Sequence, residues 1–186
     1  MRKFNLFILI FVLILTCCSK DDTDEVLTFV GDSMIANWDV EASFPNRITK
    51  NLGRDGARLN YLDDIDSLDG VVVLLIGTND LQAEMEDIQI MEYARSYEMA
   101  ISSMSANRII LLSVLPTTDS DKNEKIKSFN ATIKKWVSTF SNIEYVDCYE
   151  RYIDDKGLLK NDLTREGLHL NDYGYIILTD AVCHVL

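Results

Sequence analysis

The sequence predicts an α/β protein whose parallel sheet is covered by helices on both faces. Apolar runs without alternation recur along the chain, as is typical of strands buried on both faces of a parallel sheet. The stretches between these runs carry apolar residues three or four positions apart, and this spacing predicts helices. Strands that alternate with helices form βαβ units, which place the strands parallel.

Each predicted element follows from one of these two patterns, in chain order. The first strand covers residues 26–30 and ends at Gly31, and a weaker strand covers residues 47–50. Further strands are expected at residues 71–76, 109–114 and 143–146, and helices at residues 84–104, 124–140 and 173–186. In open α/β sheets, ligands bind outside the carboxyl ends of the strands, so the segments that follow the strands are expected to carry a site.

Length and composition narrow the class of protein. The chain has 186 residues, of which 47% are hydrophobic, and this suffices for one domain with its own core. There are 30 Asp and Glu residues against 18 Lys and Arg residues, and the formal net charge is −12. Nucleic-acid binding needs a basic face, so this charge argues against a nucleic-acid partner.

The N-terminus reads as a targeting segment. Arg2 and Lys3 precede an apolar run over residues 6–15, which is shorter than the ~20 residues of a membrane-spanning helix. The run leads into a Leu-Thr-Cys-Cys sequence that resembles the lipobox of bacterial lipoproteins, where a cysteine becomes lipid-modified after cleavage. Cys18 fits that position best and Cys17 is a second candidate. An ordinary secretory signal is the alternative.

The domain boundaries follow from this interpretation. We expect a lipoprotein signal peptide over residues 1–17, an acidic tether over residues 18–25 and a single domain over residues 26–186. The mature protein is then extracytoplasmic and lipid-anchored to the bacterial membrane. Cys148 and Cys183 remain in it, without metal-ligand spacing, and we expect two buried thiols, with a disulfide as the alternative in an exported protein.

Four short segments stand after predicted strands or before the last helix. They are Gly31-Asp32-Ser33-Met34, Asn51-Leu52-Gly53-Arg54-Asp55-Gly56, Gly77-Thr78-Asn79-Asp80 and Glu166-Gly167-Leu168-His169. Together they would bring a serine, a glycine, an amide and a histidine to one rim of the sheet. Asp32 and Asp80 are expected to accept hydrogen bonds from turn amides.

These residue types have a chemical reason to occur together. A serine hydroxyl is a weak nucleophile and needs a base, which here is a histidine. His169 is favoured over His184, because His184 lies two residues from the end of the sequence on the expected last helix. Glu166 lies three residues before His169, close enough to orient the imidazole. Backbone N–H groups of Ser33 and Gly56 and the amide of Asn79 are candidate donors to an oxyanion.

The whole set resembles the SGNH (GDSL-type) hydrolase family of esterases and lipases. The first segment is similar to the family's first block with Met34 in place of Leu, and the other three are similar to its remaining blocks. The resemblance implies a flavodoxin-like three-layer α/β/α sandwich with a five-stranded sheet, Ser33 and His169 as catalytic residues, and an oxyanion hole of Ser33, Gly56 and Asn79. Glu166 stands where the family usually has Asp. A Ser33–His169 dyad and Asp162 as the orienting carboxylate are the alternatives.

The expected activity is hydrolysis of carboxylic esters through an acyl-enzyme on Ser33, without a metal or an organic cofactor. No long apolar insertion between Asp80 and Glu166 would form a lid, so short acyl groups, such as acetyl on a carbohydrate, are the expected substrates. The alternatives are a non-catalytic surface lipoprotein that binds a glycan or a protein, and an acyltransferase.

Overall fold

The fold comes from a computed structural model, which describes residues 25–65, 68 and 70–186. The expected signal peptide, the lipid-modified Cys18 and nearly all of the tether lie outside the described residues. Within the described residues, no helix combines the length and the apolar character that crossing a membrane requires.

Five parallel strands form one sheet in the order β2-β1-β3-β4-β5. They are β1 (Val26–Gly31), β2 (Ile48–Gly53), β3 (Val71–Leu75), β4 (Arg108–Leu112) and β5 (Ile143–Val146). This is the flavodoxin-like strand order, and the predicted fold class is confirmed. The order reverses between β1 and β3, and in such sheets ligands bind at the point of reversal.

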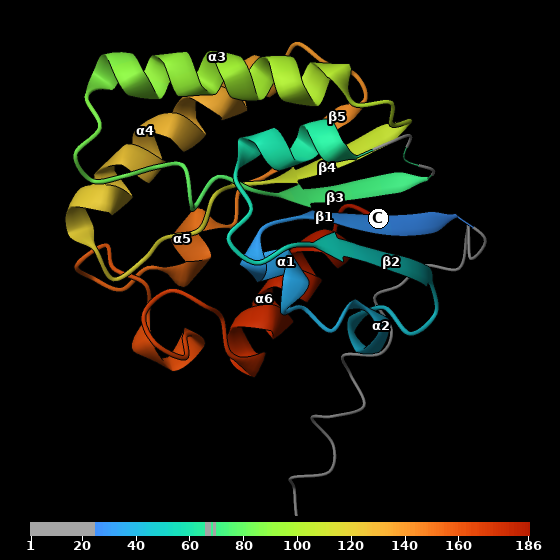
Figure 1. The fold of residues 1–186 in the computed structure, drawn as a ribbon. Helices are drawn as coiled ribbons and strands as arrows, with labels where there is room; N and C mark the ends of the chain where they lie inside the picture. The colour runs from blue at the N-terminus through green and yellow to red at the C-terminus, as the bar shows by residue number, and fades with distance from the viewer. Residues whose placement is uncertain (1–24, 66–67, 69) are drawn as a thin grey trace, which may run out of the picture.

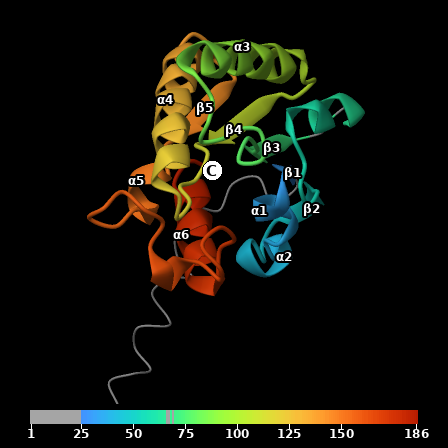
Figure 2. The same ribbon diagram turned by 60° about the vertical axis from the view of Figure 1, so that its left-hand side comes forward.

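Helices cover both faces of the sheet (Figures 1 and 2). One face packs against α3 (Asp87–Ser103), α4 (Ser120–Val137) and the 3₁₀ helix η3 (Leu59–Asp64). The other face packs against α1 (Ser33–Ala36), α2 (Val40–Ser43), the 3₁₀ helix η4 (Asn161–Leu163) and α6 (Asp172–Cys183). The short α5 (Tyr149–Tyr152) follows β5 and contributes a buried tyrosine to each of the two cores. The result is the three-layer sandwich.

Helix starts differ from the predicted ones because polar caps set them. Asp119 caps α4 by accepting hydrogen bonds from the backbone of Asp121 and Lys122, so α4 begins at Ser120, before its apolar pattern starts. Glu86 and Gln89 form a capping box that starts α3 at Asp87, after the residues predicted to open it. Apolar spacing therefore located the helices, and capping chemistry decided where they begin.

The second strand and the cysteines also differ from expectation. β2 continues to Gly53, so Asn51 and Gly53 belong to the strand and do not follow it. No disulfide joins Cys148 and Cys183. Cys148 is fully buried, and burial raises the pKa of its thiol to about 12, which leaves it protonated and unreactive. Cys183 is half-buried, so the expectation of burial is wrong for this residue.

Candidate active site

Ser33 is the first residue of α1, and Asp32 alone separates it from the interior strand β1. Asp32 caps α1, because its Oδ1 accepts a hydrogen bond from the backbone N–H of Met34 at 2.9 Å. A side chain at position 31 would place its Cβ 1.9 Å from the backbone oxygen of Leu75 in β3, so only glycine fits. The Gly-Asp-Ser sequence thus makes a tight turn from strand to helix that fixes the serine against the sheet.

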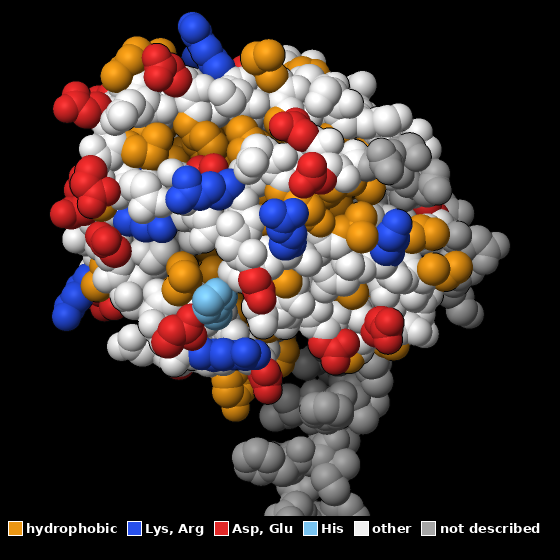
Figure 3. Space-filling view, viewed as in Figure 1, with side chains coloured by type: hydrophobic (Ala, Val, Ile, Leu, Met, Phe, Trp, Pro, Cys, Tyr) orange, Lys and Arg blue, Asp and Glu red, His pale blue; other side chains and the backbone are white. Residues whose placement is uncertain are grey.

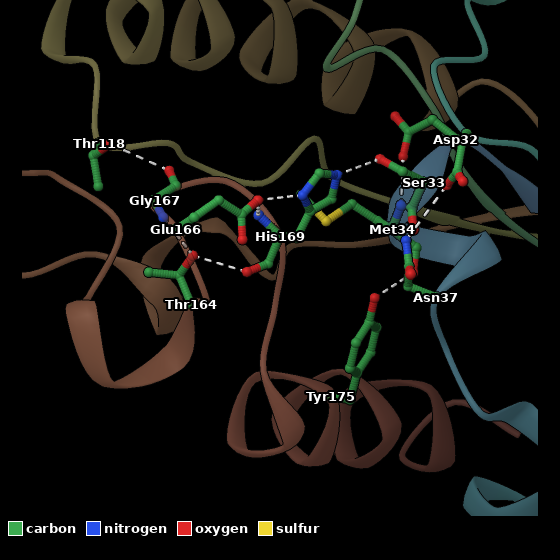
Figure 4. A network of polar contacts seen from close by, with 11 residues as sticks. Asp32, Ser33, Met34, Asn37, Thr118, Thr164, Glu166, Gly167, His169 and Tyr175 are labelled. Atoms are coloured by element: carbon green, nitrogen blue, oxygen red, sulfur yellow. Dashed lines mark hydrogen bonds and ion pairs between the residues drawn. The ribbon is translucent and has the colours of Figure 1, made fainter.

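His169, which lies near the C-terminal end of the sequence, contacts this serine. Its Nε2 lies 3.0 Å from Ser33 Oγ, although the two residues are 136 positions apart in sequence. On its other side, His169 Nδ1 is hydrogen-bonded to Glu166 Oε1, and the backbone N–H of His169 donates to the same oxygen at 3.2 Å. A proton on Nδ1 that faces the carboxylate leaves Nε2 as an acceptor for the serine hydroxyl (Figure 4).

The loop that carries His169 is held by hydrogen bonds from two threonines. Thr164 Oγ1 accepts from the backbone of Gly167 at 2.9 Å and donates to the carbonyl of His169 at 2.8 Å. Thr118, in the segment after β4, donates from its backbone to the carbonyl of Gly167 at 3.1 Å. In Figure 4 these threonines lie on the side of His169 away from Ser33. Sequence reasoning missed both threonines, since a single threonine in a loop gives no spacing signal.

A series of hydrogen bonds connects the segments that carry the predicted oxyanion donors with the end of β1, just before the serine. The backbone of Arg54 donates to Gly31, that of Ala57 donates to Arg54, and Asn79 Nδ2 donates to the carbonyl of Ala57 at 2.9 Å. An amide carries two N–H groups, so Asn79 keeps one for a ligand. Gly56 lies within this loop at φ +67°, in the left-handed region that glycine adopts without strain. The structure therefore joins the three segments that carry the predicted donors.

Two aspartates stand next to predicted site residues in the sequence, and both accept hydrogen bonds from backbone amides as predicted. Asp32 is fully buried, and burial raises its pKa from 3.8 to about 6, although the hydrogen bond from Met34 opposes this. Asp80 Oδ2 accepts from the backbone of Leu59 at 3.1 Å and from the hydroxyl of Tyr93 at 3.2 Å. Burial outweighs these hydrogen bonds and raises the pKa of Asp80 as well.

Glu166 has the opposite electrostatic behaviour. Desolvation opposes its ionisation, but hydrogen bonds from the backbone and ring of His169 and the charges of His169 and Arg165 outweigh it and lower the pKa of Glu166. The carboxylate is thus held in the charged form that can orient an imidazole.

The other residues considered from the sequence lie elsewhere. Asp162 accepts a hydrogen bond from Asn171 through its backbone oxygen, and His184 ends α6 and contacts Asp180. Tyr175 of α6, which the sequence did not point to, donates from its hydroxyl to the carbonyl of Met34 at 2.9 Å and so ties α6 to the serine turn. Over residues 25–65, 68 and 70–186, no three His, Cys, Asp or Glu side chains gather as metal ligands.

A flavodoxin-like sheet that brings a serine, a histidine and a carboxylate into hydrogen-bonding sequence at its switch point has the architecture of serine-dependent hydrolases. The comparison with protein families specifies the group. The model of the GDSL-like lipase/acylhydrolase family matches residues 29–177, and the chain belongs to this family. The resemblance seen in the sequence is confirmed.

Solved structures agree on the fold. One neighbour is a Streptococcus pneumonia protein described as a platelet activating factor. It is 28% identical to this chain, with a TM-score of 0.75, over 86% of this chain and 82% of its own. A GDSL-like lipase from Bacteroides thetaiotaomicron is 24% identical, with a TM-score of 0.64, over 87% of each chain. An acetyl xylan esterase from Geobacillus stearothermophilus is 18% identical, with a TM-score of 0.66, over 87% of this chain and 94% of its own. No curated protein matches the sequence.

Proposed function

We propose that the protein is a serine esterase that hydrolyses carboxylic esters through an acyl-enzyme on Ser33. The observation that carries this proposal is the 3.0 Å contact between Ser33 Oγ and His169 Nε2, with Glu166 on the far side of the ring. This is the order of nucleophile, base and orienting carboxylate that nucleophilic acyl transfer needs.

The proposed mechanism has two halves. His169 Nε2 takes the proton of Ser33 as Oγ attacks the acyl carbonyl, and the imidazolium then gives that proton to the leaving alkoxide. Water attacks the acyl-enzyme with His169 again as base, and the acid leaves. The N–H groups of Ser33, Gly56 and Asn79 stabilise the oxyanion of each tetrahedral intermediate, and one such donor contributes about 10²–10³ in rate. Glu166 orients the ring and stabilises the imidazolium.

The proposed substrates are short acyl esters, acetyl groups on carbohydrate in particular. One structural neighbour is an acetyl xylan esterase, and the chain has no long apolar insertion between Asp80 and Glu166 that would cover an acyl chain. Acetyl and long-acyl nitrophenyl esters should be compared, and faster turnover of the long chain would contradict this assignment.

Labelling with a fluorophosphonate tests the reaction type. The wild-type protein should be labelled and Ser33→Ala should not. A protein that binds glycan or another protein without catalysis would not be labelled in either form. Acyl transfer to added alcohols, measured against hydrolysis in the same reaction, separates an acyltransferase from an esterase.

We also propose that lipid on Cys18 anchors the mature protein to the bacterial membrane, outside the cytoplasm. The support is the lipobox-like sequence before the acidic tether. In cells fed an alkynyl fatty acid, Cys18→Ser should abolish incorporation and Cys17→Ser should preserve it. The reverse result would move the lipid to Cys17, and incorporation in neither variant nor wild type would indicate an ordinary secretory signal.

A further inference from the structure

The chain turns back on itself between Thr164 and Leu170, and His169 lies on the second arm of this turn. Thr164 and Leu170 pair as an isolated antiparallel bridge, and the backbone N–H of Arg165 donates to the carbonyl of His169 at 2.9 Å. Gly167 lies between the two arms at φ +90°, in the left-handed region that favours glycine. The turn therefore sets the direction in which the His169 side chain leaves the backbone.

One hydroxyl group joins three parts of the turn. Thr164 Oγ1 stands on the first arm, accepts from the backbone N–H of Gly167 at 2.9 Å and donates to the carbonyl of His169 at 2.8 Å. The proton of the hydroxyl and one of its acceptor sites are thus both in use. A valine at position 164 would have nearly the same shape and would make neither hydrogen bond.

The hydrogen bonds of the His169 backbone connect the turn to the imidazole ring. The carbonyl of His169 accepts from Thr164 and Arg165, and its N–H donates to Glu166 Oε1 at 3.2 Å. The same carboxylate oxygen is the partner of His169 Nδ1. One oxygen can bond both groups only while the backbone and the ring keep this relative position, so a shift of the His169 backbone would separate Nδ1 from Glu166.

The histidine and the carboxylate are partly exposed, so hydrogen bonds have a large share in holding them. Their side chains are 33% and 51% exposed, respectively. A histidine side chain is visible at the surface in Figure 3, with charged side chains near it. Thr118 holds the carbonyl of Gly167 from outside the turn, at 3.1 Å through its backbone N–H and at 3.3 Å through Oγ1. Thr118 therefore fixes the tip of the turn, whereas Thr164 bonds His169 itself.

We propose that Thr164 is a positioning residue for His169. Its hydroxyl keeps the backbone of His169 where Glu166 can bond Nδ1, so the ring proton stays on Nδ1 and Nε2 is free to accept from Ser33. An unconstrained imidazole in water favours the proton on Nε2, and in that form it cannot take the proton of the serine. The catalytic consequence rests on the proposed esterase function, whereas the position of the ring proton can be measured without a substrate.

Nitrogen NMR of the imidazole ring tests the proposal. The sequence has two histidines, so His184→Ala in the untagged protein leaves the signals of His169 alone. In mildly alkaline buffer, where an imidazole is neutral, the ring proton should lie on Nδ1 in this background. Adding Thr164→Val should move most of it to Nε2, and Thr164→Ser, which keeps the hydroxyl, should leave it on Nδ1.

Thr164→Ala is a second variant without the hydroxyl, for use if valine prevents folding. An Nδ1 proton that persists in the variants without the hydroxyl would overturn the proposal, whatever their activity. Its loss in Thr164→Ser, or its absence when Thr164 is intact, would overturn the proposal as well.

Steady-state kinetics on a nitrophenyl ester measure the effect on the reaction. Thr164→Val should lower kcat about tenfold or more and change KM less than about twofold, because it acts on the base and not on a group proposed to hold the substrate. Thr164→Ser should stay close to wild type. Thr132→Val is the matched control, since Thr132 is exposed on α4 and its hydroxyl also donates to a backbone carbonyl, that of Ser128 at 3.0 Å. Equal kcat in Thr164→Val and Thr132→Val would contradict the proposal.

The two measurements separate this inference from the proposed function. A ring proton that depends on the Thr164 hydroxyl, in a protein that hydrolyses no ester, would support the positioning role and contradict the esterase. Ester hydrolysis by the wild-type protein, with the same ring tautomer in Thr164→Val, would contradict the positioning role and leave the esterase intact.

Discussion

Ser33 and His169 lie 3.0 Å apart, but different kinds of structure hold them in place. Ser33 is 9% exposed and follows the interior strand β1, which ends at Gly31 against β3. Asp32, between the strand and the serine, is fully buried. The side chain of His169 is 33% exposed, and its loop is held by hydrogen bonds that Thr118 and Thr164 donate and by one that Glu166 accepts. The position of the nucleophile is therefore part of the core, whereas the position of the base depends on a few hydrogen bonds near the surface.

This difference separates stability from activity. We call Gly31, Asp32 and Ser33 the serine side, and His169 with the loop that holds it the histidine side. A change on the serine side should disturb core packing and lower the free energy of unfolding. A change on the histidine side should alter the reaction while the fold persists, because exposed groups contribute little to stability. The predictions below compare the two sides.

The largest effect is expected from His169→Ala. Without a base, kcat for a nitrophenyl ester should fall by at least about 10⁴, while the free energy of unfolding should change by less than about 1 kcal/mol. Steady-state kinetics and urea unfolding measure the two quantities. His184→Ala is the control and should retain wild-type kcat; more than a tenth of the activity in His169→Ala would show that another group is the base.

Glycine substitutions should break the two sides unequally. Gly31→Ala places Cβ 1.9 Å from a backbone oxygen of the sheet, which cannot move away, so a loss of about 3 kcal/mol or more in unfolding free energy is expected. Gly167→Ala places Cβ 2.6 Å from Thr118 Oγ1, which can rotate away, and it also puts an alanine at φ +90°. The backbone strain should lower the free energy of unfolding by about 1–2 kcal/mol.

Gly157→Ala isolates the backbone strain in that comparison. Gly157 has φ +75° and open space around its Cβ position, so Gly157→Ala should lower the free energy of unfolding by about 1 kcal/mol. Urea unfolding should rank the variants with Gly31→Ala the least stable and Gly157→Ala the most stable. A larger loss in Gly167→Ala than in Gly31→Ala would reverse the assignment of the rigid side.

Asp32 gives the serine side a distinctive pH dependence. Its pKa is raised from 3.8 to about 6, so the folded state holds a proton between these values that the unfolded state has lost. This contribution to stability is complete below about pH 4 and is lost as pH rises through 6, by about 3 kcal/mol. Unfolding of Asp32→Asn, which keeps the cap oxygen, should lack this decline, and an unchanged decline would contradict the assignment.

Glu166 gives the histidine side the opposite sign. Because its pKa is lowered in the folded state, its contribution to stability is present above its ordinary value of 4.5 and is lost as pH falls through the lowered pKa. A fall in pH should therefore raise the contribution of Asp32 to the free energy of unfolding and lower that of Glu166.

On the histidine side, Glu166→Gln should lower kcat less than His169→Ala does. A hydrogen bond to a charged group is worth about 1.5–3 kcal/mol, so kcat should fall about tenfold to a hundredfold at neutral pH. Asp162→Asn is the matched control and should retain kcat, because Asp162 contacts the site loop through its backbone oxygen. A loss below twofold in Glu166→Gln would favour a Ser33–His169 dyad.

Much of the molecule was predictable because its determinants are local. The central strands β1, β3 and β4 appear as unbroken apolar runs since both of their faces are buried, and the serine and asparagine segments follow them. β2 was only weakly visible and its end was misplaced, because it is an edge strand with exposed residues such as Ile48. Four-residue helices such as α1 are too short to show a period.

The supporting contacts were not predictable because they join distant residues through single polar atoms. Tyr175 and Met34 are 141 positions apart, and Thr118 and Gly167 are 49 apart. Nothing in the local sequence of a threonine or a tyrosine indicates which carbonyl it will meet.

The hydrogen bond from Tyr175 to Met34 has a consequence for biosynthesis. The β1 turn is among the first described parts of the domain to leave the ribosome, and His169 and the helix that braces the turn are among the last. In the proposed mechanism, Ser33 therefore gains its base only after nearly the whole of the described domain has been synthesised.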